Sequence, residues 1–97
     1  MIEKGDVVIA ILQNPREKIL GVLQEINSAG VFVRGVDLTY FDDWATAIKK
    51  GEEYLPMQDY FLPMWRLEKL LRDESSAATD SLSEIFKSKT GFDIKDF

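Results

Sequence analysis

The chain contains no cysteine and no histidine among its 97 residues. Without cysteine it has no disulfide framework, no iron–sulfur ligands and no thiol nucleophile. Without histidine it has neither a Ser-His-Asp triad nor an imidazole ligand for a metal ion. The glycine-rich phosphate and dinucleotide motifs and the EF-hand loop are also missing. We therefore predict a protein that is not an enzyme and that uses no cofactor and no metal.

Long apolar segments are absent too. The N-terminal apolar run extends only from Val7 to Leu12, whereas a bilayer-spanning helix needs roughly 20 apolar residues. Acidic residues precede this run, so we expect neither a signal peptide nor a membrane partner. A cytoplasmic prokaryotic protein is the resulting expectation for localisation.

Positive charge is scarce relative to negative charge, with 12 basic and 17 acidic residues and a net charge of −5. An acidic chain repels phosphate backbones on average, which disfavours generic nucleic-acid binding. Apolar residues make up 45% of the chain, which is sufficient for one packed core and a single domain. Five bases could still share one face or occupy separate solvated positions: Arg16, Lys18, Arg34, Lys69 and Arg72.

The pattern of the first half predicts three strands. Val7–Leu12 is rich in β-branched residues and is followed by turn-forming Asn and Pro. Residues 18–26 form a long second strand, and Gly21 in its interior suggests a sharp bend. A polar turn at residues 27–30 leads into a third strand at residues 31–36.

The second half combines helices with short strands. Residues 40–50 have apolar positions at helical spacing, with Thr39 as the expected N-cap and Gly51 as the C-cap. We expect its apolar face to cover the open end of a barrel. Residues 60–62 and 67–71 read as a fourth and a fifth strand, although a helix over 65–72 fits the second segment as well. Residues 73–80 read as a linker, and Ser81 with Glu84 opens a C-terminal helix.

A long second strand bent at a glycine, here Ile19-Leu20-Gly21-Val22-Leu23, resembles the first motif of the Sm-like proteins, which include the LSm and Hfq types. The resemblance covers roughly residues 5–72 and implies a mainly β fold. That fold is a five-stranded, strongly bent SH3/Sm-like barrel, with a helix inserted between strands 3 and 4 and a short C-terminal helix. The expected organisation is a barrel domain at 1–72, a linker at 73–80, and a helix with its tail at 81–97.

The resemblance also implies two functions. The first is self-association into a homo-oligomeric ring, in which the fourth strand of one subunit pairs with the fifth of the next. The implied interface residues are Tyr60, Phe61, Leu62, Leu67, Lys69 and Leu71. The alternative is RNA binding with an altered base pocket, because Asn27 stands where the family usually has an aspartate and the Gly30-Val31 region lacks its asparagine. The candidate RNA contacts are Asn27, Ser28, Arg34, Trp65 and Arg66.

Each candidate has a structural alternative. Asn27 and Ser28 also suit a tight turn, and Trp65 with Arg66 could pack on the barrel rim or a neighbour rather than stack on a base. Two pairs of carboxylates at residues 42–43 and 52–53 could hold a divalent cation, but helix-dipole compensation and a solvated loop are the favoured explanation. We therefore predict a non-enzymatic, self-associating interaction module, and its protein partner, if any, is not specified by the sequence.

Overall fold

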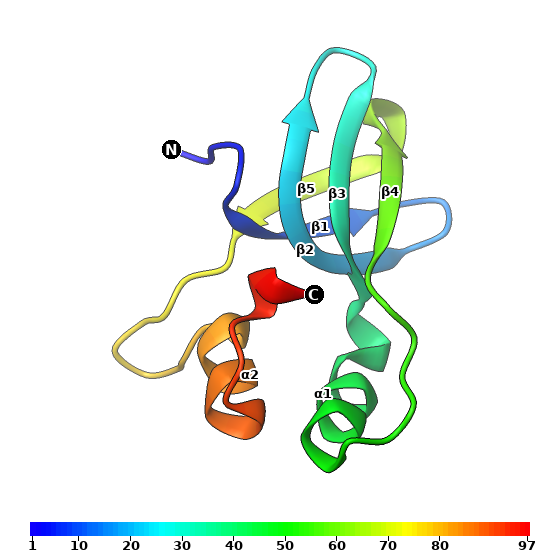
Figure 1. Cartoon of the computed structure of the whole chain (residues 1–97). Coiled ribbons are helices and arrows are strands. Elements are labelled where there is room, and N and C mark those ends of the chain that lie inside the picture. The colour runs from blue at the N-terminus through cyan, green and yellow to red at the C-terminus, as the bar shows by residue number, and fades with distance from the viewer.

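The computed structural model describes all 97 residues, which form two layers: a five-stranded antiparallel sheet and a helical layer against one of its faces (Figure 1). The strands are β1 (Val7–Leu12), β2 (Glu17–Ile26), β3 (Gly30–Asp37), β4 (Gln58–Pro63) and β5 (Leu67–Arg72). The helices are α1 (Phe41–Lys50) and α2 (Leu82–Thr90), with short 3-10 turns η1 (Leu38–Tyr40), η2 (Met64–Arg66) and η3 (Ile94–Asp96). The fold is therefore α+β rather than mainly β, and the segment after η2 is a strand rather than a helix.

The expected closed barrel is wrong, because the sheet is open. Its strand order is β4-β3-β2-β1-β5, so β4 and β5 are both edges and do not pair with each other. The contacts of η2 explain the separation. Met64 N–H donates to Ala29 O at the β2–β3 turn, while Gln13 N–H donates to Arg66 O at the β1–β2 turn. These two anchors hold the end of β4 and the start of β5 beside different turns.

Strand β2 is bent, as the sequence predicts, but the bend does not close a barrel, and Gly21 lies where the backbones of β2 and β3 approach closely. Figure 1 shows β2 rising to the β2–β3 turn at one end and curving beneath β3 and β4 at the other. Gly21 lies opposite Gly35 of β3, and a Cβ on Gly21 would stand 2.5 Å from Arg34 O and 2.8 Å from Gly35 Cα. The two backbones approach closely only because neither position carries a side chain.

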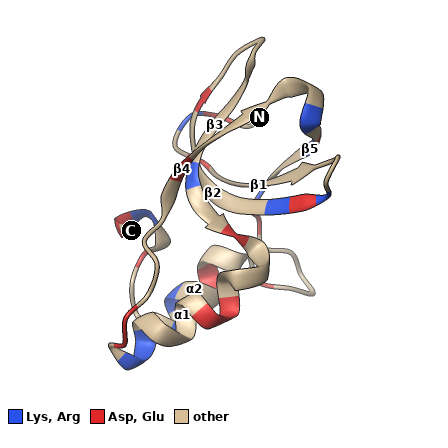
Figure 2. Cartoon of the chain, turned by 90° about the vertical axis from the view of Figure 1, so that its right-hand side faces the viewer, with Lys and Arg blue, Asp and Glu red and all other residues tan.

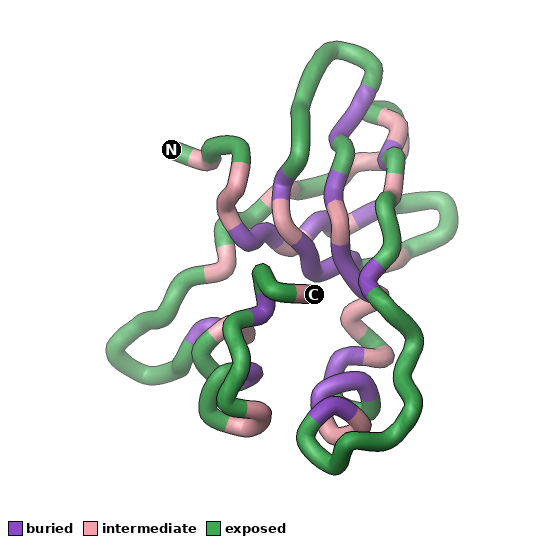
Figure 3. Tube along the Cα trace, in the orientation of Figure 1, coloured by how far each residue is buried: buried purple, intermediate pink, exposed green.

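The inner, concave face of the sheet carries a core cluster made entirely of strand residues. Its members are Val8, Ala10, Leu12, Ile19, Leu23, Val31, Val33 and Leu62. They alternate with residues that point to the outer face, as expected for strands with two distinct faces. Figure 3 shows buried segments along the strands and in α1, and exposed segments at the β2–β3 turn and in residues 74–80.

The outer face carries the second cluster, where Val7, Leu20 and Val36 meet the helices. The apolar face of α1 is buried as its spacing predicts, but it packs on this outer face and on α2 rather than on an open barrel end. Trp44 stacks on Phe86 of α2 with ring centroids 4.9 Å apart. The two helices therefore contact each other through aromatic side chains and together cover the outer face of the sheet.

The helix ends agree with the sequence in part. Ser81 Oγ accepts a hydrogen bond from Glu84 N–H, and Gly91 ends α2 in a left-handed conformation, as predicted. Thr39 is not the cap of α1: Asp37 caps the preceding η1 turn, and α1 has no side-chain cap. None of the helices is long and apolar enough to span a bilayer.

Candidate interaction surface

The outer edge of β4 is a free strand edge, because β4 pairs only with β3. The direction of its backbone groups follows from one hydrogen bond. Met64 N–H bonds to Ala29 O, and hydrogen-bonded and non-bonded pairs alternate along an antiparallel ladder. Pro63, Phe61 and Asp59 therefore occupy non-bonded positions, which suits Pro63 because it has no N–H. The N–H and C=O groups of Phe61 and Asp59 point away from the sheet.

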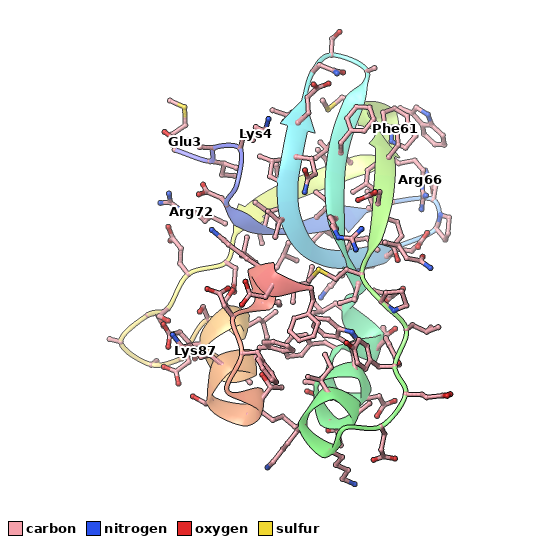
Figure 4. The ribbon with its side chains drawn as sticks, viewed as in Figure 1. Glu3, Lys4, Phe61, Arg66, Arg72 and Lys87 are labelled. Carbon is pink, nitrogen blue, oxygen red and sulfur yellow. The ribbon has the colours of Figure 1, made fainter.

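Apolar side chains lie beside this edge. Phe61 is 47% exposed and contacts Phe32 of β3, with ring centroids 4.9 Å apart. Together with Gln24, Val33, Asp59 and Tyr60 they line a shallow hollow of about 460 Å³. Figure 4 shows Phe61 near the β2–β3 end of the molecule, away from the helical layer. An exposed aromatic pair beside unpaired backbone groups is typical of a docking surface rather than of a solvated strand.

The outer edge of β5 is the second free edge. Asp73 N–H bonds to Val7 O, and Arg72 and Leu70 lie opposite Val8 and Ala10. The same alternation places Arg72 and Leu70 at non-bonded positions, so their backbone groups point outward. Leu71 lies between these two residues, so its side chain points to the opposite face of the sheet from theirs. It is 45% exposed.

The predicted interface residues divide by face. Phe61, Lys69 and Leu71 are exposed at the two edges. Leu62 is buried in the inner cluster, and Tyr60 and Leu67 pack against it. Burial raises the pKa of Tyr60, and the nearby carboxylates of Asp37 and Glu17 add to this, so the phenol stays protonated at neutral pH. Three of the six side chains predicted for the oligomer interface are therefore exposed at the free edges.

The two predicted arginines are occupied by acceptors within the chain. Arg34 donates from Nε to Phe97 O at 3.2 Å and from Nη1 to Asp59 Oδ1 at 3.3 Å. Arg66 donates to Gln13 O, Pro15 O and Glu17 Oε1, the last at 2.7 Å. The first arginine joins the C-terminal segment to β4, and the second holds the β1–β2 turn beside η2.

The remaining candidates lie near the end of the β2–β3 turn. The Asn27 Oδ1 accepts hydrogen bonds from Ala29 N–H and Gly30 N–H, so its side chain shapes the turn. Ser28 is exposed in the same turn. Trp65 is 68% exposed on η2, whose Met64 bonds to the turn. The structure therefore brings Trp65 to the same end as Asn27 and Ser28 but holds Arg34 and Arg66 in other contacts.

The candidate basic face is only partly formed. Lys18 and Lys69 flank Ile11 across β2, β1 and β5, so these two share the outer face. Arg16 pairs with Glu68 at the β1–β2 turn, and Arg72 lies near Asp6 and Glu74. Figure 2 shows basic and acidic residues interspersed over the ribbon, without a single basic stripe. No group of three or more acidic side chains is placed to hold a metal ion.

Sequence reasoning misses Phe32 and Asp59. The sequence places Phe32 in the third strand. Its ring is exposed because the helices do not pack against this part of the sheet, and the sequence does not show which part they cover. Asp59 lies just outside the predicted fourth strand, which begins at Tyr60. Gln58 and Asp59 are both polar and no apolar residue alternates with them, so no local pattern extends the strand to include Asp59.

Searches with protein-family models, curated proteins and solved structures find no match to this chain.

Proposed function

We propose that the protein is a non-enzymatic, self-associating interaction module of Sm-like fold, in which the β4 edge of one copy pairs with the β5 edge of the next. The observation that carries the proposal is the pair of free edges, each six residues long, at the two ends of one open sheet. The glycine-bent β2 supports the Sm-like assignment, as does the position of β4 and β5 at the edges, since these are the strands that this family pairs between subunits.

The two edges are complementary rather than alike. The β4 strand carries one acid, Asp59, whereas β5 carries Glu68 together with Lys69 and Arg72. Pairing of β4 with β5 therefore joins strands of opposite net charge, and pairing of two β5 strands does not. Figure 4 shows Phe61 and Arg72 on opposite sides of the molecule. Head-to-tail contacts of this kind propagate from copy to copy and produce rings when the rotation closes.

The free energies gained and lost on pairing are similar in size, so we expect a weak assembly that depends on concentration. Two outward residues on each edge can exchange four backbone hydrogen bonds, which contribute about 4 kcal/mol at about 1 kcal/mol each. Lost translational and rotational freedom costs about 4–15 kcal/mol on association. Burial of Phe61 and Leu71 at the seam must supply the remainder.

The test compares two substitutions at one edge position. Asp59→Pro removes the outward N–H without removing a bond to β3, and Asp59→Ala removes the same carboxylate but keeps the N–H. By light scattering, we expect the native chain to assemble, the Ala variant to assemble less tightly, and the Pro variant to stay monomeric. Equal assembly by the Pro and Ala variants would show that the β4 edge is not the interface.

A second partner class is favoured by one observation only. The exposed Trp65 beside Asn27 and Ser28 could stack on a nucleotide base, as in the RNA-binding alternative. The cations that such binding needs, Arg34 and Arg66, already have acceptors within the chain. Self-association is therefore the function that the geometry supports best.

A further inference from the structure

We propose that the outer face of the sheet beside β4 binds an arginine side chain presented by a basic segment of another protein. The site is the hollow of about 460 Å³ that Phe32 and Phe61 help to line, flanked by the carboxylates of Glu25 and Asp59. Its occupant differs in kind from a second copy of this chain, and its binding does not require self-association.

The strand register brings two aromatic rings and one carboxylate into a single row. Glu25 of β2 lies opposite Phe32 of β3, which lies opposite Phe61 of β4. Phe61 precedes Leu62, a member of the inner cluster, so Phe61 points to the outer face, and opposite residues share that face. Phe32 and Phe61 form a non-bonded pair, in which side chains approach closely, and their ring centroids are 4.9 Å apart. The row is therefore an aromatic surface with a carboxylate at one end.

A second carboxylate lies on the same face. Asp59 precedes Phe61 by two residues, and its side chain is 80% exposed. Its Oδ1 accepts a hydrogen bond from Arg34, whereas Oδ2 accepts none from the chain. Glu25 forms no ion pair, and only its Oε2 is engaged, by the side-chain amide of Asn27 at 2.8 Å. Each carboxylate thus keeps one oxygen free for a ligand.

Arg34 shares this face but is drawn away from the aromatic pair. Its Nε donates to Phe97 O, and Phe97 packs on Trp44 in the helical layer. Figure 4 shows Phe61 at the other end of the molecule, away from that layer. Because Arg34 neutralises a single carboxylate, the charge among these three ionised groups remains negative.

This combination of groups suits a guanidinium. The face of an aromatic ring attracts a cation, and carboxylates accept charge-assisted hydrogen bonds from its N–H groups. A planar guanidinium can stack on a ring while its edge donates to a carboxylate, whereas an ammonium is a compact and strongly hydrated charge. The net charge of −5 also attracts basic partners over a longer range.

The chain has no free arginine of its own for this site. Its four arginines each form an ion pair with a carboxylate of the same chain: Arg16, Arg34, Arg66 and Arg72. A second copy carries the same four arginines in the same pairs. The arginine that occupies the hollow therefore belongs to a different protein.

The test is a peptide titration followed by amide NMR on the ¹⁵N-labelled native chain, at a concentration where light scattering shows single chains. The probe is a five-residue glycine–serine peptide with one central arginine, blocked at both ends. Matched peptides carry lysine, or citrulline as a neutral analogue of the same shape. We expect saturable shifts around Glu25, Phe32 and Phe61, binding of the lysine peptide weaker by about threefold, and no shifts with citrulline.

Two substitutions locate the site. Phe61→Leu keeps an apolar side chain but removes the ring, and Glu25→Gln removes the charge but keeps an acceptor for Asn27. Both positions are exposed, so each variant should fold. We expect each to weaken binding of the arginine peptide by about threefold to fivefold. The controls are Phe92→Leu and Asp80→Asn, which make the same changes at exposed positions outside the hollow and should bind as the native chain does.

The possible failures are distinct. No shift at the highest concentration of arginine peptide would refute the site, and equal binding of the citrulline peptide would refute the role of charge. Equal binding of the lysine peptide would contradict the assignment of arginine. Equal effects of Glu25→Gln and Asp80→Asn would reduce the attraction to net charge alone, and shifts at the same amides with oligo-U would replace the basic partner with a nucleic acid. Self-association is measured separately, on the native chain without peptide.

Discussion

Gly21 and Gly35 form a cross-strand pair at which two backbones nearly touch. We predict that Gly21→Ala lowers the free energy of unfolding by about 1–3 kcal/mol, as overpacking commonly does. The added Cβ would meet Arg34 O at 2.5 Å, and backbone atoms cannot move aside as a flexible side chain can. Chemical denaturation measures the change.

A matched substitution shows whether the effect is specific to that contact. A Cβ added to Gly5 would have no heavy atom within 4 Å, but the φ of +94° at this position strains any other residue. Ala29→Gly is the better control, because it removes a Cβ in the exposed β2–β3 turn. A Gly21→Ala chain as stable as the native protein would contradict the close-approach account of the bend.

The fluorescence of the exposed Trp65 side chain tests the alternative that the protein binds RNA. We predict that oligo-U leaves its fluorescence unchanged even at low salt, where phosphate contacts are strongest. The reason is that the two cations predicted to contact RNA, Arg34 and Arg66, already donate to Phe97 O, Asp59 and Glu17. A Trp44→Phe background would make Trp65 the sole reporter, but Trp44 is fully buried in the core, so the native chain is the safer sample. A saturable, salt-sensitive change in emission would reinstate RNA as a partner.

The helix α2 is fixed by a residue that the sequence assigns to a linker. Asp73, which directly follows β5, accepts hydrogen bonds from Leu82 N–H, Ser83 N–H and Ser83 Oγ at 2.7–2.9 Å. Its carboxylate therefore lies at the positive end of the helix dipole. In this structure α2 docks on its own chain, and Asp73 is the link between sheet and helix.

We predict that Asp73→Ala destabilises the docked helix by about 1–2 kcal/mol, the usual range for losing a helix cap. The readout is Trp44, which stacks on Phe86 of α2 and should become more solvent-exposed as the helix loosens. The measurement uses a Trp65→Phe background, because Trp65 is exposed and would obscure the signal.

Asp80→Ala is the matched control, because it removes an exposed carboxylate from the same segment without removing a hydrogen bond. We expect it to change stability by only a few tenths of a kcal/mol, as surface substitutions usually do. Equal effects of the two substitutions would mean that the hydrogen bonds of Asp73 do not hold α2 in place.

The elements show what the sequence can and cannot reveal. The strand positions, the helix at residues 41–50 and the Ser81 cap follow from local patterns, so they are predictable. The role of Asp73 is not, because it depends on a helix nine residues further on. The contact between Arg34 and Phe97 spans 63 positions and has no local signal.

At the scale of the whole molecule, the open sheet is the largest departure from what the sequence predicts. The family resemblance predicts five strands and a bend, and both are present. Closure depends on where η2 directs β5, and this is determined by hydrogen bonds to two turns distant in the sequence, at Gln13 and Ala29. The same feature that opens the sheet creates the two edges from which the function is inferred. The residues proposed for the interface on those edges are partly visible in the sequence as apolar strand positions, but the edges themselves are not.

The most direct test of self-association is light scattering coupled to size exclusion on the native chain over a wide range of concentrations. We predict a weight-average mass that rises with concentration toward a whole-number multiple of the monomer mass. The reason is that each proposed contact between copies is weak, and assembly becomes cooperative only when the ring closes. The mass of a single chain at every concentration would contradict the account.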